Sequence, residues 1–327
     1  MTAHHRAILE AFELHGSGPL SSLLAYEAPW RAFTCAGGVV PYLEAPRAAV
    51  AWGDPLTTPE QAADALAAFA KAMGAERRGV CAIAAGERTA REALALGFSA
   101  FKIGEEPRFD LATWQRPAGN KGKKLRWAVN HARKEGVEIE EYRIAEGRDP
   151  RLDADVEAVV AGWRAGLRRP EPQSFMRTAP LEHAGAKRLF LARRGGAAEA
   201  LLACSRLPAA DAWYLEDVVR VNGSVNGATE LLVVEALARF REEGACSASF
   251  ALAPMRRVEQ QLDRRASIIG GILSVAIRGF DRRYGFRAIA RYEERFEPTE
   301  WLPRYILFCP ALPRPATIRA AVRYLMA

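Results

Sequence analysis

The chain has 327 residues, half of them hydrophobic, which is enough for a sizeable core and favours two domains over one. The formal net charge of +7 indicates an anionic partner, either nucleic acid or an acidic membrane surface. Five cysteines lie far apart without a CxxC pair, which predicts reduced thiols and argues against a disulfide framework. No run reaches the ~18 apolar residues that span a bilayer, and the N-terminus lacks the apolar core of a signal peptide. We therefore expect a cytoplasmic protein, with peripheral contact at the inner membrane face left open.

The first 115 residues alternate apolar runs with helical patterns. A helix is predicted at the N-terminus, and a hairpin across Gly37–Gly38 joins strands at 33–35 and 39–43. Further strands are predicted at 48–52, 79–85, 98–104 and 107–111, and helices at 59–73 and 89–96. Strands and helices that alternate with short connections predict a three-layer α/β sandwich.

Residues 119–136 are strongly basic. On a helix, Leu125, Val129 and Ala132 lie on one apolar stripe, with cations on the other faces and Trp127 beside them. The cations are Lys121, Lys123, Lys124, Arg126, Arg133 and Lys134. Two interpretations stay open. The stretch is either the solvated face of a surface helix, or a helix that binds RNA or lipid phosphates, which would relieve the repulsion between like charges one turn apart.

The central stretch, residues 211–255, predicts a strand, a loop rich in Asn and Gly, a helix and a second strand. The strands are expected at 213–219 and 247–252, with the helix at 231–240 between them. Two acids, Glu216 and Asp217, interrupt the apolar first strand, and Arg220 closes it. Asp217 and Arg220 either belong to an ordinary salt-bridge network at a strand end, or they line a pocket. In the pocket, Asp217 would hold an ammonium group and Arg220 an anion or a developing oxyanion.

The rest of the second half also predicts an α/β arrangement. Strands are expected at 137–142, 186–193 and 200–207, and a helix at 153–167. Residues 256–262 predict a charged helix, residues 268–278 an apolar core helix, and residues 317–326 a basic amphipathic helix that packs on its own domain rather than on lipid. The five histidines are scattered and none is favoured as a catalytic base. The sequence predicts no metal site and no cofactor.

Several motifs in this order resemble the C-terminal catalytic domain of phosphatidylglycerol lysyltransferases, the aminoacyl-phosphatidylglycerol synthases. EDVVR keeps the Asp–x–x–Arg spacing of that family's DLMR motif, NG recurs at Asn226, and ALAPM resembles GMAPL with Ala251 at its usual glycine. Near the end of the chain, YEERF and WLPRY resemble FKEKF and W-x-PRY, with Glu293 where Lys is usual. The WGDP and KIGE runs of the first half follow the same order. The resemblance thus covers roughly residues 15–315 and lacks the multi-span membrane domain that precedes this region in the synthases.

The resemblance implies an α/β (α+β) fold of two tandem GNAT-like acyltransferase units: residues 1–115, a basic linker helix at 116–136, and a catalytic unit at 137–327. It further implies transfer of an aminoacyl group, lysyl or alanyl, from aminoacyl-tRNA to a hydroxyl of phosphatidylglycerol or a similar acceptor. Asp217 and Arg220 would be catalytic, and the six cations of the basic stretch would bind tRNA. Substrate-binding residues would be Glu216, Asn226, Arg295 and Arg304.

Two other functions stay open. An acyl-CoA-dependent N-acyltransferase would present Arg/Gln-x-x-Gly-x-Gly/Ala at a helix start, so that backbone amides hold the pyrophosphate. Residues 220–225 supply only part of this pattern, with Val225 at the position of a small residue. The third function is that of a binding protein that keeps the fold without catalysis, which the departures at Glu293 and Ala251 favour.

Overall fold

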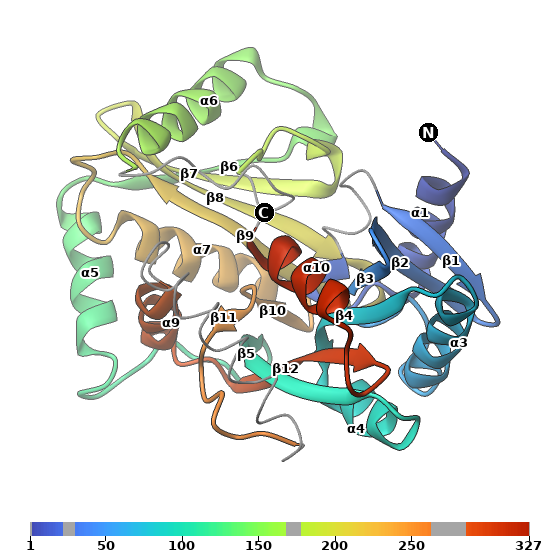
Figure 1. Cartoon of the computed structure of the whole chain (residues 1–327). Coiled ribbons are helices and arrows are strands. Elements are labelled where there is room, and N and C mark those ends of the chain that lie inside the picture. Colours follow the sequence, from blue (N-terminus) through green and yellow to red (C-terminus); the bar gives the residue numbers. More distant parts are fainter. Residues whose placement is uncertain (1, 22–29, 168–177, 263–285, 327) are drawn as a thin grey trace. The chain divides into compact units, whose positions relative to one another are not determined.

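The computed structural model describes residues 2–21, 30–167, 178–262 and 286–326 (Figure 1). The chain forms two compact units that interleave along the sequence. Unit 1 consists of residues 1–107, 252–291 and 301–327, and unit 2 of residues 108–251 and 292–300. Unit 1 therefore includes two stretches from the second half of the chain. The predicted domain division at 1–115, 116–136 and 137–327 stays a prediction.

Unit 1 is built around a mixed sheet in which three antiparallel strands are followed by a parallel one. In order across the sheet, its strands are β1 (Arg31–Cys35), β2 (Gly38–Ala45), β3 (Ala48–Trp52), β4 (Gly79–Gly86), β12 (Glu300–Cys309) and β5 (Ser99–Asp110). β1, β2 and β3 pair antiparallel, β3 and β4 pair parallel, and β12 runs antiparallel to β4. The short β11 (Ala253–Pro254) pairs with β5, whose last residues belong to unit 2.

The helices of unit 1 bury small and apolar residues against this sheet. They are α1 (Ala3–His15), α3 (Ala62–Ala75), α4 (Glu87–Ala95) and α10 (Pro315–Met326), and α9 (Phe286–Glu293) also begins in this unit. Phe69 of α3 packs on Tyr42 of β2, with ring centroids 4.9 Å apart. Ala320 and Ala321 of α10 are buried, and the helix contacts β3 and β4. The sequence predicts that this helix packs on the domain at 137–327, whereas these two strands belong to the first 115 residues.

Unit 2 has a similar succession of strands, with helices on both faces. β6 (Glu138–Tyr142), β7 (Lys187–Arg194), β8 (Ala197–Leu207) and β9 (Ala212–Arg220) pair antiparallel, and β10 (Ser247–Ser249) runs parallel to β9. α5 (Lys123–Lys134) and α7 (Ala228–Glu242) pack on one face, where Phe190, Leu202 and Leu215 are buried. α6 (Pro150–Ala165) packs on the other face, over Leu191 and Leu201. The alternation follows from the period of two in a strand.

Both units share one topology. In unit 1, β1, β2 and β3 lead through α3 into β4, and in unit 2, β7, β8 and β9 lead through α7 into β10. In each unit the strand after the helix is parallel to the strand before it, a pairing that requires a crossover connection. The predicted α/β fold of two similar units is therefore confirmed.

Three local predictions are wrong. Residues 98–104 and 107–111 are predicted as separate strands because Pro107 signals a break, but β5 runs through this proline. The strand predicted at 247–252 ends at Ser249. Residues 256–262 form turns and irregular structure instead of a helix, and Met255 and Arg257 adopt left-handed φ angles of 68° and 46° that a right-handed helix does not accept. The helix predicted at 268–278 lies outside the described residues.

Candidate active site

A β-bulge interrupts strand β9 at its two acids. Ala203 of β8 pairs with Asp217, whereas the next residue, Cys204, pairs with Leu215. Glu216 is therefore an extra residue without a partner position on β8, and such bulges re-aim the side chains around them. The only sequence signal for this feature is the pair of adjacent acids within an apolar strand, which does not by itself distinguish a bulge from regular alternation.

Beyond the bulge, the strand again alternates between its two faces. Val218 packs with the apolar cluster under α7, and Val219 packs with the cluster under α6. Asp217 therefore lies on the α6 face and Arg220 on the α7 face, because side chains three positions apart in a strand point in opposite directions. The structure does not bring this predicted pair together on one face, so the two charges have different surroundings.

Glu216 uses both carboxylate oxygens inside the sheet. Oε1 lies 3.0 Å from Nζ of Lys187 on β7, and Oε2 accepts a hydrogen bond of 2.5 Å from the hydroxyl of Ser205 on β8. The side chain of Glu216 is 13% exposed and that of Lys187 is 7% exposed. Lys187 is not among the predicted site residues, because its partner lies two strands away and 29 residues later in the chain.

Asp217 is half-buried on the α6 face. Its Oδ1 accepts a hydrogen bond of 3.1 Å from the hydroxyl of Thr178, whose backbone carbonyl accepts a 2.6 Å hydrogen bond from Arg164 of α6. Among the described residues, Glu216, Asp217 and Lys187 give this region two adjacent carboxylates and an ammonium group. An ionised carboxylate can accept several hydrogen bonds, and those from an ammonium group are among the strong, charge-assisted ones.

On the α7 face, Arg220 is exposed at the end of β9. Its Nη1 lies 3.4 Å from the hydroxyl of Ser224, in the loop that leads to α7. Asn226 is exposed in the same loop, directly before Gly227, whose φ of 96° precedes the first residue of the helix. The predicted residues Arg220 and Asn226 thus lie at the two ends of one loop, where they can contact an anion.

The first turn of α7 carries a buried acid. Glu230 accepts a 2.7 Å hydrogen bond from Arg295, so the arginine that is predicted to bind substrate is paired internally. Burial, with the negative charge of Glu230 as the next cause, raises the pKa of Tyr292, which keeps its hydroxyl protonated. A Cβ atom on Gly227 would lie 2.0 Å from the carbonyl oxygen of Ala128, so α5 packs directly against this turn.

Arg304, the other predicted substrate-binding arginine, lies in unit 1 and is largely buried. Its Nη2 and Nε donate to Oε2 of Glu106 at 2.7 and 3.0 Å, and Nη1 is 3.6 Å from Asp54. Asp54 also accepts hydrogen bonds of 3.0 and 3.2 Å from the backbone N–H of Gly86, directly before α4. The guanidinium of Arg304 therefore holds the strand ends of unit 1 together.

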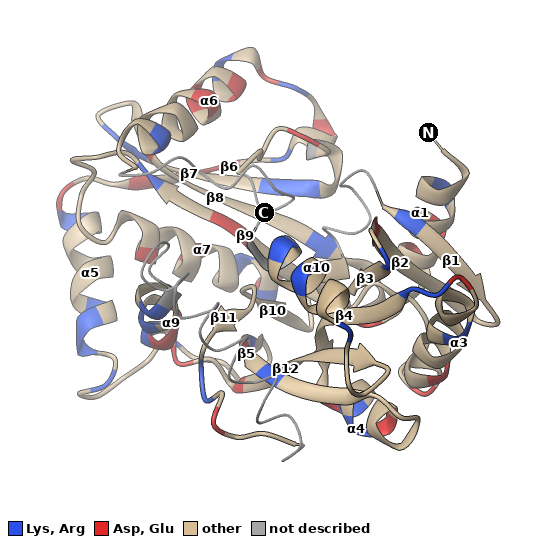
Figure 2. Cartoon of the chain, viewed as in Figure 1, with Lys and Arg blue, Asp and Glu red and all other residues tan. Residues whose placement is uncertain are grey.

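Lys and Arg residues recur along helix α5 (Figure 2), and part of the predicted set of cations is exposed. Arg126 donates to the carbonyl oxygens of Pro117 and Gly119, and Arg133 pairs with Glu235 of α7 at 2.6 Å. These two arginines are bonded within unit 2. The four lysines of the predicted set are exposed: Lys121, Lys123, Lys124 and Lys134.

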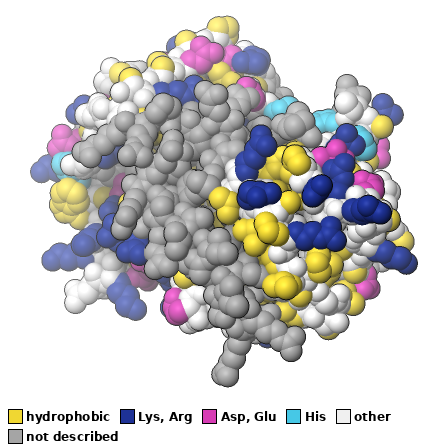
Figure 3. Space-filling view, in the orientation of Figure 1, with side chains coloured by type: hydrophobic (Ala, Val, Ile, Leu, Met, Phe, Trp, Pro, Cys, Tyr) yellow, Lys and Arg dark blue, Asp and Glu magenta, His cyan; other side chains and the backbone are white. Residues whose placement is uncertain are grey.

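An exposed aromatic pair lies on the same helix. Trp127 is 60% exposed, and its ring stacks on that of His131 with centroids 4.9 Å apart. Lys and Arg side chains gather on the surface over α5, at the left of the space-filling view (Figure 3). An aromatic ring among cations is the combination that stacks on an unpaired base while the cations bind phosphates.

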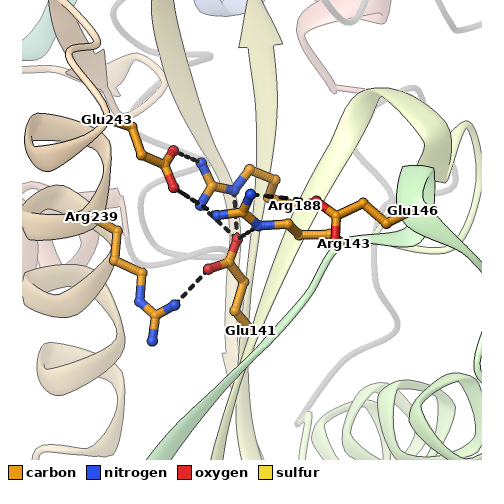
Figure 4. A network of polar contacts seen from close by, with 6 residues as sticks. All are labelled: Glu141, Arg143, Glu146, Arg188, Arg239 and Glu243. Carbon is orange, nitrogen blue, oxygen red and sulfur yellow. Dashed lines mark hydrogen bonds and ion pairs between the residues drawn. The ribbon is translucent and has the colours of Figure 1, made fainter.

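A network of arginine and glutamate side chains lies at the C-terminal end of α7 (Figure 4). Arg188 of β7 is buried; it donates to Glu141 of β6 at 2.7 Å and to Glu243 at 2.9 Å, and its guanidinium lies 4.9 Å from the ring centre of Phe240. Arg143 pairs with the same two acids. Burial raises the pKa of Glu141, but hydrogen bonds from Arg143 and Arg188 outweigh it and lower the pKa below its usual value. This network fastens α7 to the strands.

The described part of the chain shows neither a metal cluster nor a membrane span. Within it, no three His, Cys, Asp or Glu side chains are grouped so that they could hold a metal ion. Among the helices of that same part, none is long and apolar enough to cross a bilayer.

The sequence matches the family model described as phosphatidylglycerol lysyltransferase, C-terminal, over residues 15–308. The match includes every residue of the candidate site, from Asp54 to Arg304, and parts of both units. A search of curated protein sequences gives no significant match.

Three solved structures share the fold of this chain. The C-terminal domain of a putative lysylphosphatidylglycerol synthetase from Agrobacterium fabrum has a TM-score of 0.77 at 18% identity, over 98% of this chain and 96% of that one. L-PGS from Bacillus licheniformis has a TM-score of 0.76 at 17% identity, over 99% and 96%. A conserved protein of unknown function from Bacteroides thetaiotaomicron has a TM-score of 0.64 at 14% identity, over 94% and 97%. The predicted α/β fold class is confirmed by these likenesses.

Proposed function

The chain belongs to the family of phosphatidylglycerol lysyltransferase C-terminal domains, and from this premise we propose that it is an aminoacyltransferase. It takes the aminoacyl group of an aminoacyl-tRNA and transfers it to a hydroxyl of an anionic phospholipid such as phosphatidylglycerol. The observation that carries the proposal is the half-buried carboxylate of Asp217, held by Thr178 next to a second acid on β9 and within the matched region.

The proposed reaction depends mainly on positioning. The acceptor hydroxyl attacks the carbonyl carbon of the aminoacyl ester and forms a tetrahedral oxyanion. Its collapse breaks the bond to the tRNA ribose oxygen, which leaves as a hydroxyl and takes up the proton that the acceptor hydroxyl has lost. Because the ester is already activated, orientation and oxyanion stabilisation supply much of the catalysis.

In this proposal, the two faces of β9 serve different parts of the donor. Asp217 binds the α-ammonium group that every aminoacyl ester carries, through charge-assisted hydrogen bonds. Arg220 lies on the other face, so it binds the phosphate or ribose of the tRNA 3′ end, together with Asn226 in the same loop. The exposed lysines of α5 bind the RNA backbone.

The remaining predicted arginines are assigned supporting roles. Arg295 and Arg304 each neutralise an internal acid, Glu230 or Glu106. We therefore infer that they position the first turn of α7 and the strand ends of unit 1 and do not bind the acceptor phosphate directly. Since the acceptor is a membrane lipid, the protein works peripherally at the inner membrane face.

The rival function, acyl-CoA-dependent N-acylation, fits the start of α7 poorly. A pyrophosphate would bind the N–H groups of that turn. Glu230 is buried in the turn, and α5 packs on Gly227, so a diphosphate would meet a carboxylate and a backbone carbonyl. This arrangement favours the tRNA-dependent reaction.

The proposal is tested by transfer in vitro with the full chain. The protein is incubated with tRNA that carries labelled alanine or lysine and with vesicles of phosphatidylglycerol, and the lipids are analysed by mass spectrometry. We expect a new aminoacylated lipid, and its loss when the charged tRNA is first digested with ribonuclease. Coenzyme A binding in calorimetry without any lipid product would contradict the proposal.

The role of Asp217 is tested in the same assay. Asp217→Ala should lower transfer by roughly 100-fold or more, the range seen when a preorganised contact to the reacting group is removed. Asp211→Asn is the matched control, because Asp211 is exposed directly before β9 and Asn tolerates its left-handed backbone. Normal transfer by a folded Asp217→Ala variant would remove Asp217 from the mechanism.

A further inference from the structure

We propose that Lys187 sets the donor preference of the candidate site, so that an aminoacyl group with an uncharged side chain, of the alanyl type, is accepted in preference to a lysyl group. The inference rests on the proposed function and narrows its donor. It is carried by a juxtaposition that the sequence does not reveal: an ammonium group of the chain itself already occupies the carboxylate next to Asp217.

The ion pair between Lys187 and Glu216 is short and largely buried. Its N–O distance is 3.0 Å, and Ser205 donates to the other oxygen of Glu216, so both oxygens have partners on neighbouring strands. Separating a buried pair leaves an uncompensated charge, which is strongly unfavourable. An incoming cation therefore does not readily displace Lys187 from Glu216.

Lys187 and Asp217 lie on the same face of the sheet. Lys187 precedes Leu189 by two residues, and Asp217 precedes Val219 by two residues. Leu189 and Val219 both pack in the cluster under α6, and side chains two apart in a strand share a face. The bulged residue Glu216 is next to Asp217 in the chain, and its carboxylate contacts Lys187. The three charged groups thus belong to one region of the α6 face.

This arrangement separates aminoacyl donors into two classes. Every donor carries the α-ammonium group, for which Asp217 is the proposed acceptor. A lysyl group brings a second ammonium group that needs a second carboxylate, but the adjacent one, Glu216, is already neutralised by Lys187. The like charge of Lys187 also repels a second cation. Specificity is a difference between affinities, and here the repulsive element is part of the chain itself.

A binding experiment tests the preference without relying on transfer. L-alaninamide and L-lysinamide carry the two kinds of side chain, and calorimetry measures the Kd of each with the full chain at pH 7. We expect the wild-type protein to bind L-alaninamide about tenfold or more tightly than L-lysinamide, which corresponds to one charged interaction. Lys187→Met removes the charge at similar length, so it should tighten L-lysinamide binding about tenfold without a comparable gain for L-alaninamide.

A double variant separates charge from packing. Lys187→Met with Glu216→Gln removes both charges, so the gain for L-lysinamide should disappear, whereas a gain caused by loosened packing would persist. Arg194→Met is the matched control, because Arg194 is a cation on the same strand that pairs with Glu199 at the surface. Lys187→Arg keeps the charge and should keep the wild-type preference, and thermal unfolding checks that each variant is folded.

The outcomes distinguish this inference from the proposed function. Wild-type protein that prefers L-lysinamide or binds neither amide overturns the inference, and so does an unchanged ratio of affinities in folded Lys187→Met. The same proteins are then assayed for lipid transfer from alanyl-tRNA and lysyl-tRNA. The expected ratio of amide affinities without any aminoacylated lipid would overturn the proposed function and leave the binding preference supported.

Discussion

The two units repeat one strand order but use the charges near their parallel strands differently. In unit 1, Asp54 follows β3 and binds the backbone N–H of Gly86, and Arg304 holds both Asp54 and Glu106. In unit 2, Arg220 is exposed at the end of β9. Ligands of open α/β sheets bind outside the carboxyl ends of the strands. Internal ion pairs therefore neutralise the charges at this edge in unit 1, whereas in unit 2 the cation of Arg220 is exposed and can bind a partner.

Removing the ion pairs of Arg304 in unit 1 should have the largest effect on the unfolding free energy. Arg304→Met leaves Glu106, which is 3% exposed, without the charge of this arginine. Removing one partner of a buried ion pair costs about 3–5 kcal/mol of unfolding free energy. Urea unfolding followed by circular dichroism should show a loss of this size.

Two further variants test the cause of that loss. Arg304→Met with Glu106→Gln should be clearly more stable than Arg304→Met alone, because the buried charge is gone. Arg88→Met removes exposed pairs with Glu60 and Glu92 and should change the unfolding free energy by less than about 1 kcal/mol. Similar losses at Arg304 and Arg88 would contradict the interpretation of Arg304 as buried support.

In unit 2, Arg220→Met should lower activity while it leaves the unfolding free energy almost unchanged. Arg220 is exposed and its contact to Ser224 is 3.4 Å long, so the unfolding free energy should change by no more than about 0.5 kcal/mol. The kcat/KM for charged tRNA should fall roughly tenfold or more, because a charge-assisted contact to the RNA end is lost. Arg206→Met, at an exposed position on β8, is the control and should keep its activity. An unchanged kcat/KM for Arg220→Met would place Arg220 among ordinary surface charges.

The sequence reveals features that depend on near neighbours, but not contacts between residues that lie far apart in the chain. The types of the elements follow from apolar spacing, which depends on near neighbours, so the predicted hairpin at Gly37–Gly38 and the unit from β9 to β10 are both present. The bulge at Glu216 is not visible, because it depends on the register with β8. Lys187 is missed for the same reason. Arg304 is found through its motif, but its partner Glu106 lies 198 residues earlier, so the sequence does not show that its charge is used internally.

Unit 2 is also stabilised by internal ion pairs. The unfolding free energy that is lost at acid pH measures their contribution. The pKa of Glu243 is lowered first by its hydrogen bond to Arg188, and that of Glu141 is lowered despite burial. A lowered pKa in the folded state contributes stability above the unfolded pKa of about 4.3, and this contribution is lost as the pH falls through the folded value. Glu141→Gln should therefore be less stable than wild type at pH 7, and the difference should shrink below about pH 4.

Urea unfolding between pH 7 and pH 3 measures that difference. Glu138→Gln, at an exposed position on the same strand, is the control. A difference between wild type and Glu141→Gln that stays constant down to pH 3 would show that the network stabilises unit 2 through shape alone, without its charges.

The smallest effect concerns a backbone feature that the two units share. Arg47 and Asp211 directly precede β3 and β9, the strands before the crossover helices, and have left-handed φ angles of 59° and 44°. This region costs an L-residue about 1–2 kcal/mol, and the greater backbone entropy that glycine loses offsets about 0.5–1 kcal/mol of any gain. Arg47→Gly should therefore raise the unfolding free energy by about 0.5–1 kcal/mol, measured by thermal unfolding.

Asp211→Gly should gain less, because Asp tolerates this region better than Arg does. Arg47→Ala keeps the strain and should unfold near the wild-type temperature. Equal gains for Arg47→Ala and Arg47→Gly would trace the effect to the arginine side chain and not to its backbone.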